Sequence, residues 1–157
     1  MDLQAVVDGI AAELRPLAGA QGTVASYIPA LARVRGDQFG IALRSCDGAE
    51  AAAGDCDVPF SIQSISKLFS LTLCLQLIGE ALWERVGREP SGNPFNSLVQ
   101  LENEQGKPRN PFINAGAIAV ADRLLSQGRS ATDLLVLLGS LAATAITIDE
   151  EVAASEA

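Results

Sequence analysis

The sequence predicts an α+β fold that is mostly helical and contains one short antiparallel hairpin. Three observations support this. Apolar residues recur at helical spacing in several segments. One segment, Phe39 to Leu43, instead alternates apolar and small or polar residues, which is typical of a half-buried strand. Apolar residues make up 48% of the 157 residues, which is enough to build a packed core.

The first sixty residues carry the expected hairpin. A helix is predicted over residues 3 to 15, with Asp2 as its N-cap, because apolar residues recur there every fourth position. Asp47-Gly48 favours a tight turn after the strand around Phe39 to Leu43. The return strand, Ala49 to Ala53, is placed only because a hairpin needs a partner strand.

The remainder of the chain is predicted to be helical with polar loops. A core helix is expected from Ser61 to Gly79, since it is apolar almost all round from Leu68 onward. Loops are expected over residues 89–96 and 101–109. Three more helices are expected: from Pro111 to about Leu125, from a Ser130–Asp133 capping box to about Leu141, and from a second capping pattern at Thr147 and Glu150.

Composition excludes several kinds of site. The chain has 11 basic and 19 acidic residues, giving a net charge of −8, so it lacks the basic surface that nucleic-acid binding requires. It contains no histidine, which excludes Ser-His-Asp and Cys-His catalysis and any histidine-bound metal within the chain. We therefore expect no nucleic-acid partner and no histidine-bound metal.

Targeting signals are not visible. Met1 to Leu3 is not followed by a basic and then an apolar segment, and the apolar stretch Leu68 to Ile78 is too short to span a membrane. The spacing of Cys46, Cys56 and Cys74 matches no metal or redox motif. The odd count favours reduced, buried thiols. Cys46 and Cys56 flank a predicted turn and could form a disulfide if oxidised. These features predict a cytoplasmic protein with no membrane partner.

Ser64 and Lys67 are the first candidates for chemistry. They stand three residues apart at the start of the most apolar helix, so their side chains share one face. A lysine in apolar surroundings tends to lose its proton, and a neutral amine can take the proton of a serine hydroxyl. This Ser-x-x-Lys pattern occurs in serine acyl transferases that use no histidine. It also arises by chance, and a serine in a first turn is more often a helix cap.

Three other residues and one segment have both a functional and an ordinary interpretation. Asn114, surrounded by small residues inside a predicted helix, suits a polar substrate, but also a tightly packed surface. Tyr27, the only tyrosine, is either a site hydroxyl or a half-buried ring. Glu156 lies in an acidic run, which is usually a solvated face. Ser91-Gly92-Asn93 mimics the S-x-N element of β-lactamases, but its Pro/Gly-rich surroundings favour a turn.

Taken together, four segments resemble the serine-dependent glutaminases, which have a fold like that of β-lactamases and penicillin-binding proteins. The resemblance runs from about Tyr27 to the last residue. Its four motifs occur in order and at suitable separations, so they are far more specific than Ser-x-x-Lys alone. They are Ser26-Tyr27-Ile28-Pro29, Phe60 to Lys67, Glu89-Pro90-Ser91-Gly92, and Lys107 to Ile118.

The resemblance implies a role for each matching residue. Ser64 looks like the family's nucleophile and Lys67 like its proton acceptor. Asn114, Glu156 and Tyr27 are similar to residues that bind the substrate, together with Ser64 itself. The implied reaction is hydrolysis of L-glutamine to L-glutamate and ammonia through a γ-glutamyl ester, without metal or cofactor. Family members commonly assemble from several subunits, so a homo-oligomer is expected.

The same resemblance implies that residues 1–157 form the N-terminal part of one catalytic domain, ending before further strands and tyrosine motifs. We therefore expect this chain alone to be poorly active or inactive. Two alternatives stay open. One is a non-catalytic fragment that acts only through association with a partner, and the other is a penicillin-recognising Ser-x-x-Lys acylase.

Overall fold

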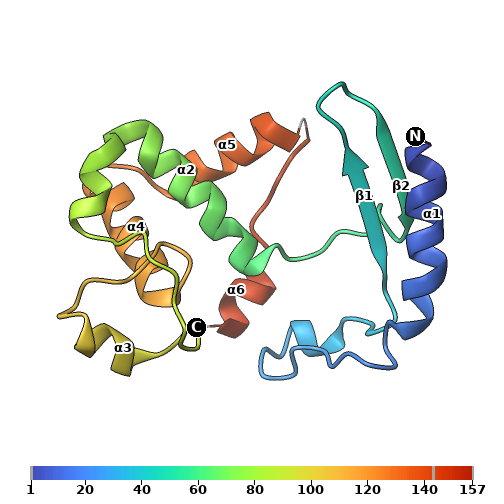
Figure 1. The fold of residues 1–157 in the computed structure, drawn as a ribbon, viewed down its shortest axis with the longest axis horizontal. Coiled ribbons are helices and arrows are strands. Elements are labelled where there is room, and N and C mark those ends of the chain that lie inside the picture. Colours follow the sequence, from blue (N-terminus) through green and yellow to red (C-terminus); the bar gives the residue numbers. More distant parts are fainter. Residues whose placement is uncertain (1, 143, 157) are drawn as a thin grey trace. The chain divides into compact units, whose positions relative to one another are not determined.

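A computed structural model describes residues 2–142 and 144–156 (Figure 1). The chain divides into two compact units. Residues 1–61 and 148–157 make the first, and residues 62–147 make the second. Each unit is described by itself. The first contains the sheet, and the second contains Ser64, Lys67 and Asn114.

The first unit is a helix packed on a two-stranded antiparallel ribbon. Helix α1 (Leu3–Leu14) packs mainly against β2 (Glu50–Gly54) and also touches β1 (Gly40–Arg44), and Figure 1 shows the three side by side. Asp2 caps α1 by accepting from the N–H groups of Gln4 and Ala5 at 3.0 and 3.2 Å. The pairing runs from Gly40 opposite Gly54 to Arg44 opposite Glu50. The predicted helix, cap and hairpin are therefore confirmed.

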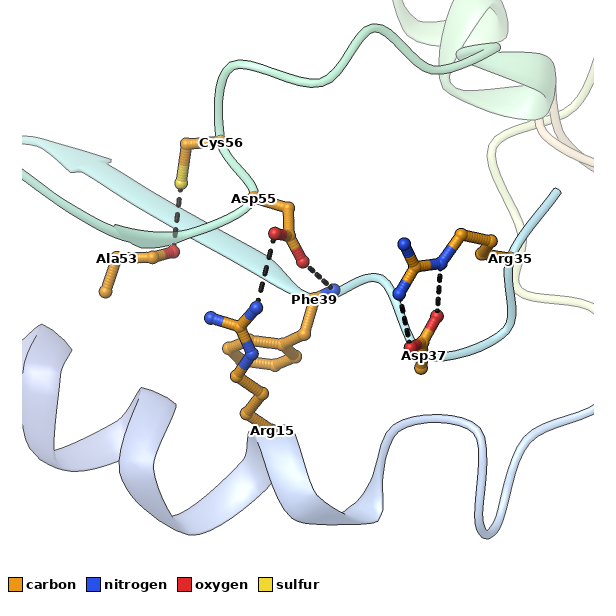
Figure 2. A network of polar contacts seen from close by, with 7 residues as sticks. All are labelled: Arg15, Arg35, Asp37, Phe39, Ala53, Asp55 and Cys56. Atoms are coloured by element: carbon orange, nitrogen blue, oxygen red, sulfur yellow. Dashed lines mark hydrogen bonds and ion pairs between the residues drawn. The ribbon is translucent and has the colours of Figure 1, made fainter.

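The ribbon is tied to α1 by side-chain hydrogen bonds. The Gln4 amide donates to the Ala52 carbonyl at 2.9 Å and accepts from the Ala52 N–H at 3.3 Å, as a neighbouring strand would. At the open end of the hairpin, Asp55 accepts from the Phe39 N–H at 3.0 Å and from the Arg15 guanidinium at 3.3 Å (Figure 2). These contacts hold the ribbon at its middle and at its open end.

The cysteines differ from the expectation of small buried residues. Cys74 is buried, and its burial raises the pKa of its thiol, whereas Cys46 and Cys56 are exposed. Cys46 follows the Arg44 end of the ribbon and Cys56 follows the Gly54 end. The four strand steps between those ends alone span about 13 Å, which is too far for a disulfide. The sulfur of Cys56 instead donates to the Ala53 carbonyl (Figure 2).

The second unit is helical. A 3₁₀ turn (Gln63–Ile65) leads into α2 (Ser66–Ile78), which continues as a 3₁₀ segment (Gly79–Glu84). Helix α2 packs against α4 (Asn114–Ser126) and α5 (Ala131–Ala142). The buried core cluster consists of Leu71, Cys74, Leu82, Val86, Val120 and Leu124.

Two helices of the second unit differ from the prediction. Helix α4 begins at Asn114 and not at Pro111, because Ile113 is extended and the Asn110 side chain caps a separate turn over residues 111–113. Helix α3 (Leu98–Asn103) overlaps a segment predicted as loop. The loop at residues 89–96 and the Ser130–Asp133 capping box are confirmed. The Ser130 N–H donates to Asp133 at 2.8 Å, and this hydrogen bond lowers the pKa of the carboxyl group.

Helix α6 (Glu150–Glu156), in the first unit, has a different cap from the one predicted. Asp149 accepts from the N–H groups of Glu151 and Val152 at 3.1 and 3.0 Å, so it fills the position expected for Thr147. A bonded ion pair between Arg33 and Glu151 ties α6 to the rest of its unit.

The apolar helix is longer in the structure than the stretch Leu68 to Ile78 considered above. The helical run Gln63–Glu84 has 22 residues and a mean hydropathy of 1.4, so its length and composition are sufficient to cross a membrane. One such helix is weak evidence, since core helices pass the same test, and this run packs against α4 and α5. The absence of a membrane partner stays a prediction.

Leu82 tests the core of the second unit. Its side chain is fully buried, whereas Leu125 on α4 is 67% exposed. We expect Leu82→Ala to lower the free energy of unfolding by about 2–5 kcal/mol through lost burial and a cavity. The matched change Leu125→Ala should cost less than about 0.5 kcal/mol. Urea unfolding of both variants measures this, and equal effects would contradict the assigned core.

Candidate active site

Ser64 lies in the 3₁₀ turn directly before α2, and its side chain is exposed. The preceding residue, Gln63, has a φ of +45°, a left-handed conformation that costs a non-glycine residue about 1–2 kcal/mol. Backbone strain of this kind clusters at functional sites, where the surrounding structure maintains it. The strain therefore supports the assignment of Ser64 as a functional residue.

Lys67 lies in the first turn of α2 and is half-buried. Its Nζ donates to Oδ1 of Asn114 at 2.7 Å and to the Phe112 carbonyl at 3.2 Å. It also lies 5.8 Å from the centroid of the Phe95 ring. No ion pair joins Lys67 to a carboxylate among residues 2–142 and 144–156. Two uncharged oxygens and an aromatic face thus surround the amine.

Asn114 is the first residue of α4 and is half-buried. Its backbone N–H donates to the Phe95 carbonyl at 2.8 Å, which fixes the start of the helix. Its side-chain oxygen accepts from Lys67, while its amide nitrogen makes no hydrogen bond to the described part of the chain. That nitrogen is available to donate to a ligand. The side chain thus differs from the ordinary surface amide of the alternative interpretation.

Ser64 and Lys67 are not hydrogen-bonded to each other. Their spacing places both side chains on the same side of the helical run. Within the residues that the structure describes, however, the Ser64 hydroxyl has no hydrogen-bond partner, and the two bonded protons of the Lys67 amine go to α4 and the residues before it. The structure thus joins Lys67 to Asn114 and leaves the serine hydroxyl open.

Close backbone packing holds the start of α4 in place. A Cβ atom at Gly116 would lie 1.8 Å from the carbonyl oxygen of Asn110. Only glycine allows the turn at residues 110–113 to press against the first turn of α4. The small residues around Asn114, which suggested space for a ligand, therefore serve backbone packing at Gly116.

The other predicted residues have separate positions. Tyr27 (83% exposed) and Glu156, in α6, belong to the first unit, so their roles beside Ser64 stay predictions. Ser91 and Asn93 form a turn in which the Ser91 hydroxyl donates to the Asn93 carbonyl at 3.2 Å. Among the described residues, no group of three or more Cys, Asp or Glu side chains is placed to hold a metal ion.

Sequence reasoning missed three participants. The Phe112 carbonyl and the Phe95 ring contact Lys67, and Gln63 carries the strained backbone before Ser64. Residue type does not reveal a backbone carbonyl contact or a positive φ at glutamine. Phe112 and Gln63 both lie in motifs already singled out, and that membership was the available signal.

Gly116 provides a stability test of the site. We expect Gly116→Ala to destabilise the protein by about 1–3 kcal/mol, because the new methyl group would displace the Asn110 backbone. Gly139, in α5, is the matched control, since a Cβ there would meet only an ordinary contact at 3.4 Å. Gly139→Ala should be neutral or stabilising by up to about 1 kcal/mol, as is usual inside helices. Thermal unfolding measures both, and a neutral Gly116→Ala would refute the close packing.

Comparison with known proteins identifies the family. The glutaminase family model matches residues 22–157. A glutaminase of Methylobacterium sp. (strain 4-46) is 61% identical over 159 residues, covering 99% of this chain and 51% of that protein. The chain therefore spans about half the length of the curated relatives it matches.

Solved structures agree. Mglu in its tris and glutamate form has a TM-score of 0.85 and 36% identity over 99% of this chain and 35% of that one. A probable glutaminase of Bacillus subtilis has a TM-score of 0.80 and 36% identity, over 99% and 48%. The fold is accordingly the β-lactamase-like glutaminase fold in part, mostly helical with a two-stranded antiparallel sheet, and the chain belongs to the glutaminase family.

Proposed function

We propose that this protein hydrolyses L-glutamine to L-glutamate and ammonia, with Ser64 as nucleophile and Lys67 as its proton acceptor. The observation that carries the proposal is the 2.7 Å hydrogen bond between Lys67 and Asn114. It brings together residues from two separate motifs, next to an exposed serine, in a chain of the glutaminase family. The glutamate form of the related Mglu is consistent with glutamate as product.

The geometry around Lys67 supports a role as base. A neutral amine has two N–H groups and one lone pair. When the N–H groups donate to the Phe112 carbonyl and the Asn114 oxygen, the lone pair stays available for the proton of the Ser64 hydroxyl. Both acceptors are uncharged, so the site holds the amine without pairing it to a carboxylate.

The reaction then proceeds in two steps. Ser64 Oγ attacks the carbonyl carbon of the glutamine side chain while its proton passes to Lys67. The tetrahedral intermediate collapses, the C–N bond breaks, and the Lys67 proton leaves with the nitrogen as ammonia. Water then adds to the γ-glutamyl ester and gives a proton to Lys67. Lys67 returns this proton to Ser64 Oγ as the ester C–O bond breaks, which releases glutamate and restores the Ser64 hydroxyl. Every proton is accounted for without metal or cofactor.

Two further groups support binding and charge stabilisation. The backbone N–H of Ser64, which follows the strained Gln63, has no hydrogen-bond partner among the described residues and suits a developing oxyanion. The amide nitrogen of Asn114 is free to donate to substrate. Tyr27 and Glu156 complete the substrate-binding set in this proposal.

The wider setting is also a proposal. Residues 1–157 form the N-terminal part of one catalytic domain, which fits a chain of about half its relatives' length. The protein acts in the cytoplasm as a homo-oligomer, in line with its acidic composition and with the expectation from the family resemblance.

Ammonia release from L-glutamine by the purified chain tests this function. We expect slow release that falls at least about 10³-fold in Ser64→Ala, since loss of the nucleophile removes the covalent route. Ser140→Ala is the matched control, because that exposed hydroxyl on α5 bonds only the Leu137 carbonyl. Mass spectrometry with an electrophilic glutamine analogue should find the label on Ser64.

The outcomes separate the alternatives. If the chain neither releases ammonia nor is labelled at Ser64, the proposal for this chain is contradicted and a non-catalytic fragment is favoured. Labelling of Ser64 by a β-lactam without glutamine turnover would instead favour a penicillin-recognising acylase.

A further inference from the structure

Asn110 makes three hydrogen bonds at the turn before α4. Its Oδ1 accepts from the N–H groups of Phe112 and Ile113 at 3.0 and 3.1 Å. Its Nδ2 donates to the Glu89 carbonyl at 2.9 Å. One side chain thus holds the turn closed and ties it to the segment that contains Glu89.

The backbone on both sides of Asn110 is tightly packed. Residues 87–89 run beside residues 108–109, with Gly87 N–H donating to the Pro108 carbonyl at 2.7 Å and Glu89 N–H to the Arg109 carbonyl at 2.9 Å. A Cβ at Gly87 would lie 2.5 Å from the Arg109 carbonyl oxygen. Gly116 closes in from the other side, so the turn has little room to shift.

This turn carries one of the two oxygens that hold Lys67, the Phe112 carbonyl, and leads directly into Asn114, whose side chain carries the other. Asn110 bonds the N–H of Phe112, and the carbonyl of the same residue accepts from Lys67. It also bonds the N–H of Ile113, the residue directly before Asn114. The position of the lysine amine therefore depends on the turn that Asn110 closes, although the two side chains are not hydrogen-bonded to each other.

We propose that Asn110 is a positioning residue for Lys67: it places the Phe112 carbonyl and the Asn114 amide as the two acceptors that aim the amine at Ser64. The proposal rests on the proposed function for its catalytic meaning. The acceptor oxygen of Asn110 performs the positioning, and its donation to Glu89 anchors the turn to the neighbouring segment.

The acceptor and donor functions of Asn110 are separable by substitution. Asn110→Ala removes both and leaves two backbone N–H groups without their partner. Asn110→Ser keeps a neutral oxygen that can accept at the same turn, as serine does at helix caps, but loses the donor to Glu89. Asn103→Ala is the matched control, because Asn103 is exposed at the end of α3.

Lysine signals in NMR spectra report the geometry without requiring activity. The chain has only two lysines, Lys67 and Lys107, so a sample labelled with ¹³C and ¹⁵N in lysine shows two side-chain signals. Lys107→Arg assigns them. Lys107 donates to the Trp83 carbonyl at 2.8 Å and serves as the internal reference for the folded state of the unit.

We expect Asn110→Ala to move the Lys67 signal while the Lys107 signal stays in place. Asn110→Ser should restore the Lys67 signal, and Asn103→Ala should change neither. A Lys67 signal unmoved in a folded Asn110→Ala variant would overturn the proposal. Equal movement of both signals would also overturn it, because it would indicate a general structural role for Asn110.

Glutamine turnover is the second readout. If Asn110 positions the base, Asn110→Ala should lower kcat roughly 10- to 100-fold, the loss expected from an error of about 1 Å in a reacting group. Asn110→Ser should recover most of it. If the wild-type chain turns over glutamine but the Lys67 signal is unmoved in Asn110→Ala, this proposal alone is contradicted. If Asn110→Ala moves the Lys67 signal but the wild-type chain shows no turnover, the positioning is supported and the proposed function alone is contradicted.

Discussion

The hydrogen bonds from Lys67 to the Phe112 carbonyl and to Asn114 connect the first turn of α2 to the turn before α4 and to the first residue of α4. Among the described residues, the bond to Asn114 is the one side-chain hydrogen bond between α2 and α4. The two helices otherwise pack through apolar residues such as Leu71 and Val120. A typical intramolecular hydrogen bond contributes about 0.5–1.5 kcal/mol to stability. Helix packing brings the two turns together, and the lysine sets their register.

The rest of the site follows from where α4 begins. Because Ile113 is extended, Asn114 starts the helix with its side chain directed at Lys67. The extended conformation is held by the turn that Asn110 closes, and the turn fits only because residue 116 has no side chain. The strained backbone at Gln63 directly precedes Ser64, in the turn that leads into the helix carrying Lys67. Local backbone constraints thus position the Asn114 side chain against Lys67.

Periodicity and cap residues predicted much of the fold. Helix α1 with Asp2, the hairpin around Asp47-Gly48 and the Ser130–Asp133 capping box depend on contacts between near neighbours, which residue type reveals. The start of α4 was predicted three residues too early, since proline at the first helical position is common and the extended Ile113 depends on contacts with Glu89 and Phe95. Such contacts join residues that are far apart in the sequence, so local spacing does not reveal them.

In the candidate site, too, residue type revealed the side chains but not the backbone contacts that depend on the tertiary structure. Ser64, Lys67 and Asn114 were candidates from residue type and spacing, because the chemistry requires particular side chains, and their roles came from the family resemblance. The Phe112 carbonyl was not, since every residue has a carbonyl and only the tertiary structure selects one. Tyr27 and Glu156 came from the family resemblance, and their position relative to Ser64 depends on the arrangement of two separate units.

A double-mutant cycle tests the link between α2 and α4 most directly. It would compare Lys67→Met, Asn114→Ala and the combined variant with the wild type by urea unfolding. The structure predicts a coupling free energy of about 1 kcal/mol or more, because each single change removes the same 2.7 Å hydrogen bond. Additive effects, within about 0.3 kcal/mol, would show that the two side chains do not interact in solution and would contradict the account of the site.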